Sequence, residues 1–167
     1  IAVEKNLEAF LSLKLPGSKV VIGEGPQEAE LKRRFPEAHF LGLLQGPELA
    51  AHIAAADVFV FPSLTDTFGI VQLEALASGV PVAAFPVTGP QDVIGDAPIG
   101  VLSDDLREAC LGALRVSRSA CRAHALGQSQ PVRSPRQRLP DRRRQMGVDR
   151  RLDAEHLRAA VHGAEPA

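Results

Sequence analysis

Two acidic residues and a glycine lie where one expected strand gives way to a helix. Asp66 and Glu74 are eight positions apart, and Gly69 stands between them at the expected start of the helix. The first N–H groups of a helix have no partner inside it and carry the positive end of its dipole, so this place suits an anion such as a phosphate. The spacing alone favours a simpler explanation, in which Asp66 caps the helix and Glu74 is an ordinary exposed residue.

A second glycine-containing turn, Gly23-Glu24-Gly25, also follows an expected strand and precedes an expected helix. It resembles the beginning of a dinucleotide-binding fingerprint, in which a third glycine follows three positions later. That position holds Glu28, and a bulky acid opposes the close approach of a pyrophosphate. We therefore expect a tight turn into a helix here rather than a dinucleotide site.

These residues depend on a series of short apolar strands that alternate with helices. The expected strands are Val20–Ile22, His39–Leu41, Val58–Phe61, Val80–Phe85 and Ile99–Leu102, and the expected helices cover 6–13, 27–35, 47–56, 69–78, 89–94, 104–114 and 117–126. Strands that are apolar on both faces and followed by helices are typical of a parallel sheet covered on both sides. The predicted fold class is α/β, a Rossmann-like doubly wound parallel sheet. Such sheets bind ligands beyond the carboxyl ends of their strands.

On the helix of residues 69–78 we expect Leu73, Leu76 and Ala77 on the apolar side. Residues three and four apart share one side of a helix, and Glu74 does not fall on that stripe. The sequence therefore predicts that Glu74 projects away from the core.

Composition places the chain among ordinary globular proteins. It has 167 residues, of which 45% are hydrophobic and 23% charged, and this size predicts one domain. No apolar run approaches the roughly 20 residues of a membrane-spanning helix. Cys110 and Cys121 form no disulfide framework and lie in no metal-binding motif, and no secretory signal opens the sequence. We expect a cytoplasmic protein, and integral membrane, collagen, coiled-coil and disulfide-scaffold classes are excluded.

The net charge of −1 combines two unlike regions. Residues 1–127 carry 10 Lys and Arg against 15 Asp and Glu, whereas residues 128–167 carry nine Arg against five acids, four Pro and no aromatic residue. Low hydrophobicity with many charges and prolines predicts disorder, so we expect the second region to be a poorly structured basic tail. At the other end, Ile1-Ala2-Val3 reads as the end of a first strand that begins before residue 1.

The segment from Asp66 to Val82 resembles the nucleotide-sugar-binding signature of retaining GT-B glycosyltransferases, family 4, also called glycosyl transferases group 1. That signature is an acid, seven residues, a Glu, and then Ala-x-Ala-x-Gly-x-Pro-Val, which Asp66 and residues 74–82 match. Residues 55–63 are similar to the strand before it, residues 21–26 to the family's Gly-x-Gly-Pro turn and residues 40–42 to its base-binding loop. The resemblance runs from about Val3 to Leu126. It implies the C-terminal, donor-binding domain of such an enzyme.

The resemblance implies a role for each residue of the signature. Glu74 would accept hydrogen bonds from both ribose hydroxyls of the nucleotide, which suits a carboxylate. Gly69, Ile70 and Val71 would offer backbone N–H groups to the diphosphate. Asp66 stands in place of the family's first Glu, which contacts the donor sugar, and its side chain is one methylene shorter.

The same resemblance implies roles for residues outside the signature. Lys5 is similar to the family's phosphate-binding Lys, whose partner Arg would lie before Ile1, and such cations stabilise a departing diphosphate. Gly42, Leu43 and Leu44 lie in the loop that lines the base pocket, although the two leucines fit ordinary packing about equally well. No metal is expected, because Lys5, the Arg and the helix N–H groups would neutralise the leaving group.

The expected function is transfer of a sugar from a UDP-sugar or GDP-sugar to an acceptor hydroxyl, with retention of anomeric configuration. Residues 1–127 would be the donor-binding half. A lipid or saccharide acceptor, and any peripheral contact with the cytoplasmic face of a membrane, would involve an N-terminal domain that this chain lacks, so the chain alone should be inactive. No specific nucleic acid partner is expected. The alternatives are a non-catalytic nucleotide-binding module and, less favoured because of Glu28, a Rossmann oxidoreductase.

The tail departs from the family, whose members continue into an aromatic-containing helix that packs back across the molecule. We interpret residues 128–167 as the product of a reading-frame shift near Gly127, because Arg, Pro, Ala and Gly codons dominate alternate frames of GC-rich genes. A genuine basic tail that binds nucleic acid or anionic lipid is the rival interpretation.

Overall fold

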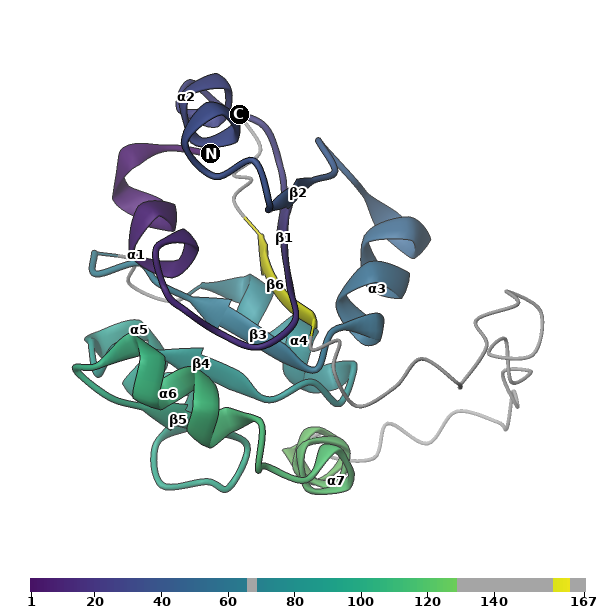
Figure 1. Cartoon of the computed structure of the whole chain (residues 1–167). Coiled ribbons are helices and arrows are strands. Elements are labelled where there is room, and N and C mark those ends of the chain that lie inside the picture. The colour runs from purple at the N-terminus through teal and green to yellow at the C-terminus, as the bar shows by residue number, and fades with distance from the viewer. Residues whose placement is uncertain (66–68, 129–157, 163–167) are drawn as a thin grey trace.

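The computed structural model describes residues 1–65, 69–128 and 158–162, which form a parallel sheet with helices on both of its faces (Figure 1). The strands are β1 (Ser18–Ile22), β2 (His39–Phe40), β3 (Val58–Phe61), β4 (Val82–Ala84), β5 (Gly100–Leu102) and β6 (Arg158–His162). The helices are the 3₁₀-helix η1 (Val3–Lys5) and the α-helices α1 (Leu7–Leu11), α2 (Glu28–Arg34), α3 (Gly46–Ala55), α4 (Ile70–Ala77), α5 (Thr88–Ile94), α6 (Leu106–Ala113) and α7 (Arg118–Gln128).

The strand order is β2-β1-β6-β3-β4-β5, and every pair is parallel. After β1 the chain moves outward to β2, and after β2 it crosses to β3 on the other side of the sheet. Such a reversal opens a crevice at the carboxyl ends of the strands that flank it. The predicted fold class is confirmed, and for this strand order the crevice is expected at the carboxyl ends of β1 and β3, which flank β6 in the sheet.

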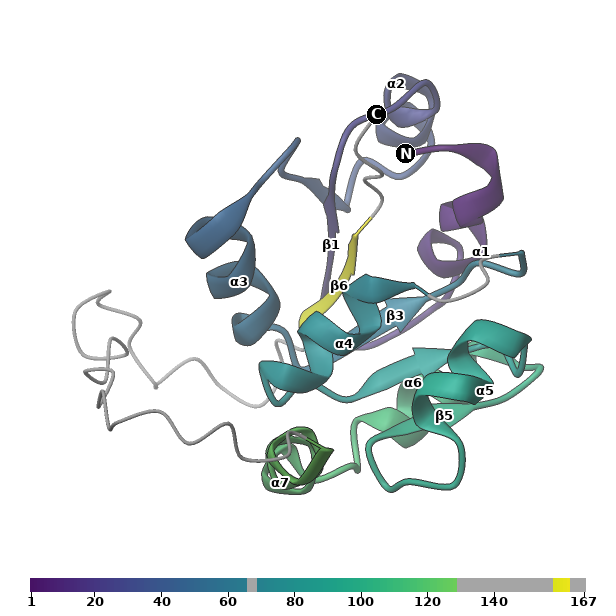
Figure 2. The ribbon, with the colours of Figure 1, turned by 180° about the vertical axis from the view of Figure 1, so that it is seen from behind.

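The central strand β3 explains why the sheet is covered on two sides. Val58 and Val60 belong to one buried cluster, with residues of α1, α2 and α6, while Phe59 and Phe61 belong to a second, with residues of α3, α4, α5 and α7. Successive side chains of a strand point to opposite faces, so four apolar residues in a row require two cores. Figure 1 shows α6 on the near side of the sheet, and Figure 2 shows α4 in front when the molecule is seen from behind.

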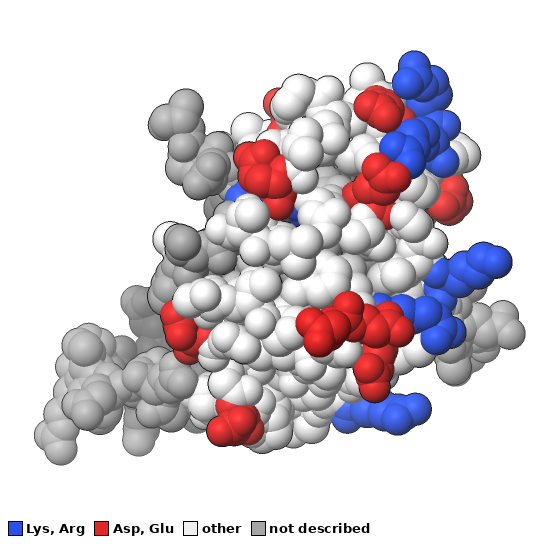
Figure 3. All heavy atoms as spheres, turned by 90° about the vertical axis from the view of Figure 1, so that its left-hand side faces the viewer, with Lys and Arg blue, Asp and Glu red and all other residues white. Residues whose placement is uncertain are grey.

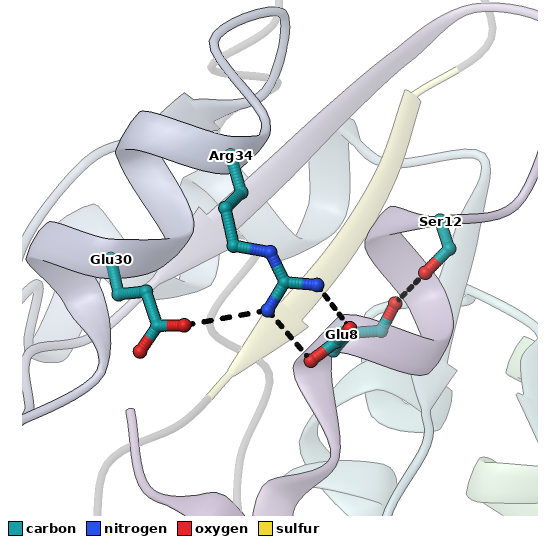
Figure 4. A network of polar contacts seen from close by, with 4 residues as sticks. All are labelled: Glu8, Ser12, Glu30 and Arg34. Atoms are coloured by element: carbon teal, nitrogen blue, oxygen red, sulfur yellow. Dashed lines mark hydrogen bonds and ion pairs between the residues drawn. The ribbon is translucent and has the colours of Figure 1, made fainter.

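The two helices that cover the β1 side are also linked at the surface. The Arg34 guanidinium of α2 donates hydrogen bonds to the carboxylate of Glu8 on α1, with 3.0 Å between Nη1 and Oε2, and reaches Glu30 at 3.4 Å (Figure 4). Exposed pairs of this kind add little stability. They link α1 to α2 at the surface.

Strand β6 differs from the sequence-based expectation. We expected residues 128–167 to lie outside the α/β domain, but Arg158–His162 pair with β1 on one side and with β3 on the other. The prediction that Ile1-Ala2-Val3 ends a strand is also wrong, because these residues are in no strand and Val3 begins η1. A central strand depends on two neighbours distant in sequence, and the local pattern Arg-Ala-Ala-Val-His carries little of that information. Residues 129–157 and 163–167 lie outside the described residues, so the expected disorder of the tail stays a prediction there.

Candidate functional site

Several loops meet at the carboxyl edge of the sheet, beside the crevice. The β1–α2 turn and the β2–α3 loop are joined by a hydrogen bond from Gly23 N–H to the Gly42 carbonyl, at 2.7 Å. The β3–α4 loop is joined to η1 by side-chain hydrogen bonds from Asn6 and Ser63. The structure therefore brings the segments that carry Lys5, Gly42 and Gly69 to one edge of the molecule.

The end of the β3–α4 loop depends on Gly69. Its φ of 63° lies in the left-handed region, which most side chains avoid. A Cβ added there would come within 2.7 Å of the Phe61 ring and of the Gln72 side-chain nitrogen. Glycine at this position lets the loop turn tightly over the end of β3 and enter α4. Asp66, the other acid of the predicted site, lies outside the described residues.

The first turns of α4 face outward. Ile70 is 66% exposed, Val71 is half-buried, and Glu74 is exposed, while Gln72 is completely buried. Helix geometry leaves the N–H groups of Ile70 and Val71 without partners inside α4, and the predicted anion site depends on these groups. The prediction that Glu74 projects away from the core is confirmed.

The apolar stripe of α4 is not the one predicted from sequence. Gln72, Ala75 and Leu76 are buried, whereas Leu73 and Ala77 are exposed. The helix is rotated so that the amide of Gln72 lies beneath the turn at Gly69. Gln72 was missed because a glutamine is more often found at the surface, and no local pattern signals its burial.

Lys5 is the last residue of η1 and is half-buried. Asn6, directly after it, has a φ of 51° and starts α1 from a left-handed turn. Sequence reasoning included Lys5 but missed Asn6 and Ser63, whose hydrogen bonds bring η1 to the β3–α4 loop. The only available signal was that Asn adopts the left-handed region more readily than other non-glycine residues.

The residues predicted to line a base pocket follow β2. Gly42 has a φ of 72°, Leu43 is 47% exposed and Leu44 is half-buried. The exposure of Leu43 argues against the alternative that it is an ordinary packing residue. The side chain of Leu44 is consistent with either role.

The backbone of Ile1 occupies the space beside the Gly23-Glu24-Gly25 turn. A Cβ on Gly25 would lie 2.7 Å from the Ile1 carbonyl carbon, and Ile1 is buried. The Ile1 amino group donates to the Glu24 carbonyl, and Gln27 N–H donates to the Ile1 carbonyl at 3.3 Å. The close approach that Gly25 permits is therefore to the Ile1 backbone, which agrees with the predicted tight turn.

Exposed large apolar side chains gather on the same edge. Those of the described residues follow the carboxyl ends of β2 and β3 or lie in η1: Val3, Leu41, Leu43, Leu64, Ile70 and Leu73. Figure 3 shows the side on which α1 and the β3–α4 loop lie in Figure 1. Uncharged areas interrupted by groups of acidic side chains occupy its middle, and basic side chains gather along one margin.

The cysteines lie away from this edge. Cys110 and Cys121 are buried in the two cores, and burial raises the pKa of the Cys110 thiol to about 12 and also raises that of Cys121. Both are packing residues. Within the described residues, no three His, Cys, Asp or Glu side chains lie close enough to hold a metal ion. None of the helices described has the length and apolar character needed to cross a membrane.

Comparison with known proteins gives a family match over most of the described core. A family model described as glycosyl transferases group 1 matches residues 5–116, which include every candidate residue named above. The chain is 46% identical over 99 residues to the sulfoquinovosyl transferase SQD2 of Arabidopsis thaliana, covering 56% of this chain and 19% of the relative. It is 40% identical over 106 residues to a GDP-mannose-dependent alpha-mannosyltransferase of Mycolicibacterium smegmatis, covering 62% and 28%. The chain thus spans about a fifth to two fifths of such relatives.

Solved structures agree on the fold. WaaG, a glycosyltransferase involved in lipopolysaccharide biosynthesis, superposes with a TM-score of 0.59 at 24% identity, over 77% of this chain and 40% of that one. Anabaena Alr3699/HepE, solved in complex with UDP, superposes with a TM-score of 0.60 at 18% identity, over 75% and 42%. At these identities the likeness establishes the GT-B-type fold of the domain.

Proposed function

Because the chain belongs to the family of glycosyl transferases group 1, we propose that it is the donor-binding half of a glycosyltransferase that takes its sugar from a nucleoside diphosphate and retains the anomeric configuration. The observation that carries this proposal is the outward-facing start of α4 at the crevice, where the exposed carboxylate of Glu74 lies one turn beyond the N–H groups of Ile70 and Val71. In a nucleoside diphosphate, the phosphate oxygens and the ribose hydroxyls are a few ångströms apart. Backbone N–H donors close to a carboxylate acceptor therefore suit both parts of such a ligand.

The diphosphate would lie at the start of α4. Backbone N–H groups and the helix dipole favour an anion there, and the Lys5 turn lies against the same loop. Gly69 lets the backbone turn closely beneath the ligand, because any side chain would meet Phe61 and Gln72. Together these groups would stabilise negative charge on the diphosphate as it departs.

With the diphosphate at the start of α4, the ribose, the base and the sugar of the donor would contact the other candidate residues. Glu74 would accept hydrogen bonds from the ribose hydroxyls, and the loop of Gly42, Leu43 and Leu44 would lie against the base. Asp66 would contact the sugar. In the reaction the bond between the anomeric carbon and the diphosphate breaks, the acceptor oxygen bonds to that carbon on the same face, and the released diphosphate takes up the proton of the acceptor hydroxyl. No metal is needed in this proposal, since Lys5 and the helix N–H groups supply the positive charge.

The acceptor would bind outside this chain. Because the chain spans less than two fifths of the relatives described above, we assign the acceptor, a lipid or a saccharide, to a further domain. The exposed apolar residues beside the crevice, including Val3, Leu64 and Ile70, form the surface on which such a domain would close. Any peripheral contact with a membrane would also belong to that domain, and the chain alone would bind the donor without transferring its sugar.

Titration calorimetry with UDP and GDP on the full chain tests the proposal. The full chain is required, because β6 completes the sheet between β1 and β3. Both nucleotides are used, since one relative is named for GDP-mannose and one superposed structure holds UDP. We expect one of them to bind with one-to-one stoichiometry and NAD not to bind. A folded chain that binds neither UDP nor GDP would contradict the donor site, and binding of NAD instead would favour the oxidoreductase alternative.

A further inference from the structure

Two hydrogen bonds join η1 to the beginning of the β3–α4 loop across more than fifty residues of sequence. The side-chain amide of Asn6 donates to the Pro62 carbonyl at 3.1 Å, and the Ser63 hydroxyl donates to the Glu4 carbonyl at 3.0 Å. Lys5 lies between Glu4 and Asn6, so each of its chain neighbours is bonded to the loop. We refer to these two hydrogen bonds as the clasp.

Asn6 combines two properties that the clasp needs. Among the described residues it is the only non-glycine residue with a positive φ, at 51°. This left-handed turn ends η1, with Asn6 N–H donating to the Val3 carbonyl at 3.0 Å, and starts α1. Glycine would make the same turn at lower cost but has no side chain to donate to Pro62. The hydrogen bond from the Asn6 side chain to Pro62 therefore explains why asparagine, and not glycine, stands at this left-handed position.

Ser63 carries the connection further into the loop. Its side chain is almost fully buried, and its hydroxyl accepts a hydrogen bond from Thr65 N–H at 3.4 Å while donating to Glu4. One hydroxyl thus ties the end of β3, the turn of the loop and the η1 backbone together. Buried hydroxyls with both a donor and an acceptor contact hold their neighbours in one arrangement.

We propose that Asn6 and Ser63 are positioning residues, which hold the Lys5 turn against the β3–α4 loop so that the Lys5 ammonium and the first N–H groups of α4 act on the same diphosphate. This inference rests on the function proposed above. A lysine side chain has many rotamers, so the position of its ammonium group depends on how firmly its backbone is held. With both neighbours of Lys5 bonded to the loop, η1 and the start of α4 move as one unit.

The test compares nucleoside diphosphates with monophosphates. For the full chain and its variants, calorimetry gives the ratio of UDP affinity to UMP affinity, and of GDP affinity to GMP affinity, which we call the diphosphate preference. Asn6→Gly keeps the left-handed turn and removes only the amide, and Ser63→Ala removes only the hydroxyl. Ser12→Ala, which removes a hydroxyl bonded to the Glu8 carbonyl elsewhere on α1, is the matched control. Lys5→Ala reports the full contribution of the cation.

We expect Asn6→Gly and Ser63→Ala each to lower the diphosphate preference roughly 3- to 10-fold, the usual effect of one hydrogen bond, with monophosphate affinity nearly unchanged. Adding Asn6→Gly to Lys5→Ala should lower the preference no further, because the clasp acts through Lys5. An equal loss of affinity for both nucleotides, or an unchanged preference in both variants, would overturn the clasp while leaving the donor site intact. A wild-type chain that binds no nucleoside diphosphate would overturn the proposed function and the clasp with it.

Discussion

The β1–α2 turn and the β3–α4 turn leave neighbouring parts of one sheet edge, and each contains a glycine and leads into a helix. In the first, the space beside Gly25 is taken by the backbone of Ile1, which is buried. In the second, Gly69 packs inward on Phe61 and Gln72, and the helix that follows begins with an exposed Ile70. A Cβ on either glycine would meet protein atoms, so a glycine turn before a helix does not by itself identify a ligand site. We call the first turn filled, because Ile1 packs against it, and the second open, because the helix after it begins with an exposed residue.

The largest expected effect is on the filled turn. Gly25→Ala puts a methyl group against the Ile1 backbone and forces Ile1 out of its core. Losing the burial of one such side chain should lower the free energy of unfolding by roughly 1.5–3 kcal/mol. Chemical denaturation followed by circular dichroism measures this difference.

Gly46→Ala separates the cost of backbone strain from the cost of a clash. Gly46 has a φ of 54° but nothing within 4 Å of an added Cβ, so it reports the backbone cost alone, about 1–2 kcal/mol. Gly25 does not have a left-handed φ, so its loss must come from the clash. If Gly25→Ala is as stable as the wild type, the first turn is open and the distinction between the turns fails.

The second effect belongs to the open turn. Glu74→Ala removes an exposed carboxylate, so it should change the free energy of unfolding by less than about 0.5 kcal/mol. If Glu74 accepts the ribose hydroxyls, UDP or GDP affinity should fall by about 1–3 kcal/mol. Calorimetry and denaturation of the same variant separate the two quantities. Glu108→Ala, an exposed helix acid on α6, is the control and should bind as the wild type does.

A smaller effect is expected for Ile70, the exposed apolar residue that follows the open turn. Ile70→Ser changes a side chain that is 66% exposed, so thermal denaturation should place its stability within about 0.5 kcal/mol of the wild type. Ile53→Ser on α3, a fully buried position, should be strongly destabilising by comparison. Equal losses in the two variants would mean that Ile70 is packed and the start of α4 is closed.

The smallest effect concerns the helices beside the filled turn. The hydrogen bonds from Arg34 hold the pKa of the Glu8 carboxyl below its usual value of 4.5, so the folded state favours ionised Glu8. That contribution to stability is present above the usual pKa and is lost as the pH falls through the lowered one. Arg34→Ala should therefore lose less stability than the wild type between about pH 6 and pH 3.

Arg33→Ala is the control for that comparison, because no ion pair of Arg33 is found within the described part of the chain. Acid denaturation curves that coincide for wild type and Arg34→Ala would show that the contact between α1 and α2 does not persist in solution.

Local sequence predicted most of the sheet, the turn at Gly69 that starts α4 and the exposure of Glu74. Val58-Phe59-Val60-Phe61 is apolar on both faces and could only be a central strand, and β3 has these bounds. Gly69 and Glu74 were located correctly because a strand end, a glycine and a helix face are all local features. Rotation of α4 by a fraction of a turn was not predictable, since it depends on how Gln72 and Leu76 pack against other elements.

The parts that sequence missed depend on contacts between distant residues. The clasp joins Asn6 to Pro62 and Glu4 to Ser63, and neither pair leaves a periodic pattern. Strand β6 was missed for the same reason, because its two neighbours, β1 and β3, lie about 100 residues or more before it in the chain. The frame-shift interpretation of residues 128–167 stays a prediction, which sequencing of the gene in all frames would test.

The central claim is that the open β3–α4 turn, and not the filled β1–α2 turn, receives the diphosphate. Two-dimensional NMR of the full chain during titration with UDP or GDP tests it most directly. The account predicts large amide shifts at Gly69, Ile70 and Val71 and smaller ones at Gly23 and Gly25. Shifts concentrated at Gly23 and Gly25, with the start of α4 unmoved, would contradict it.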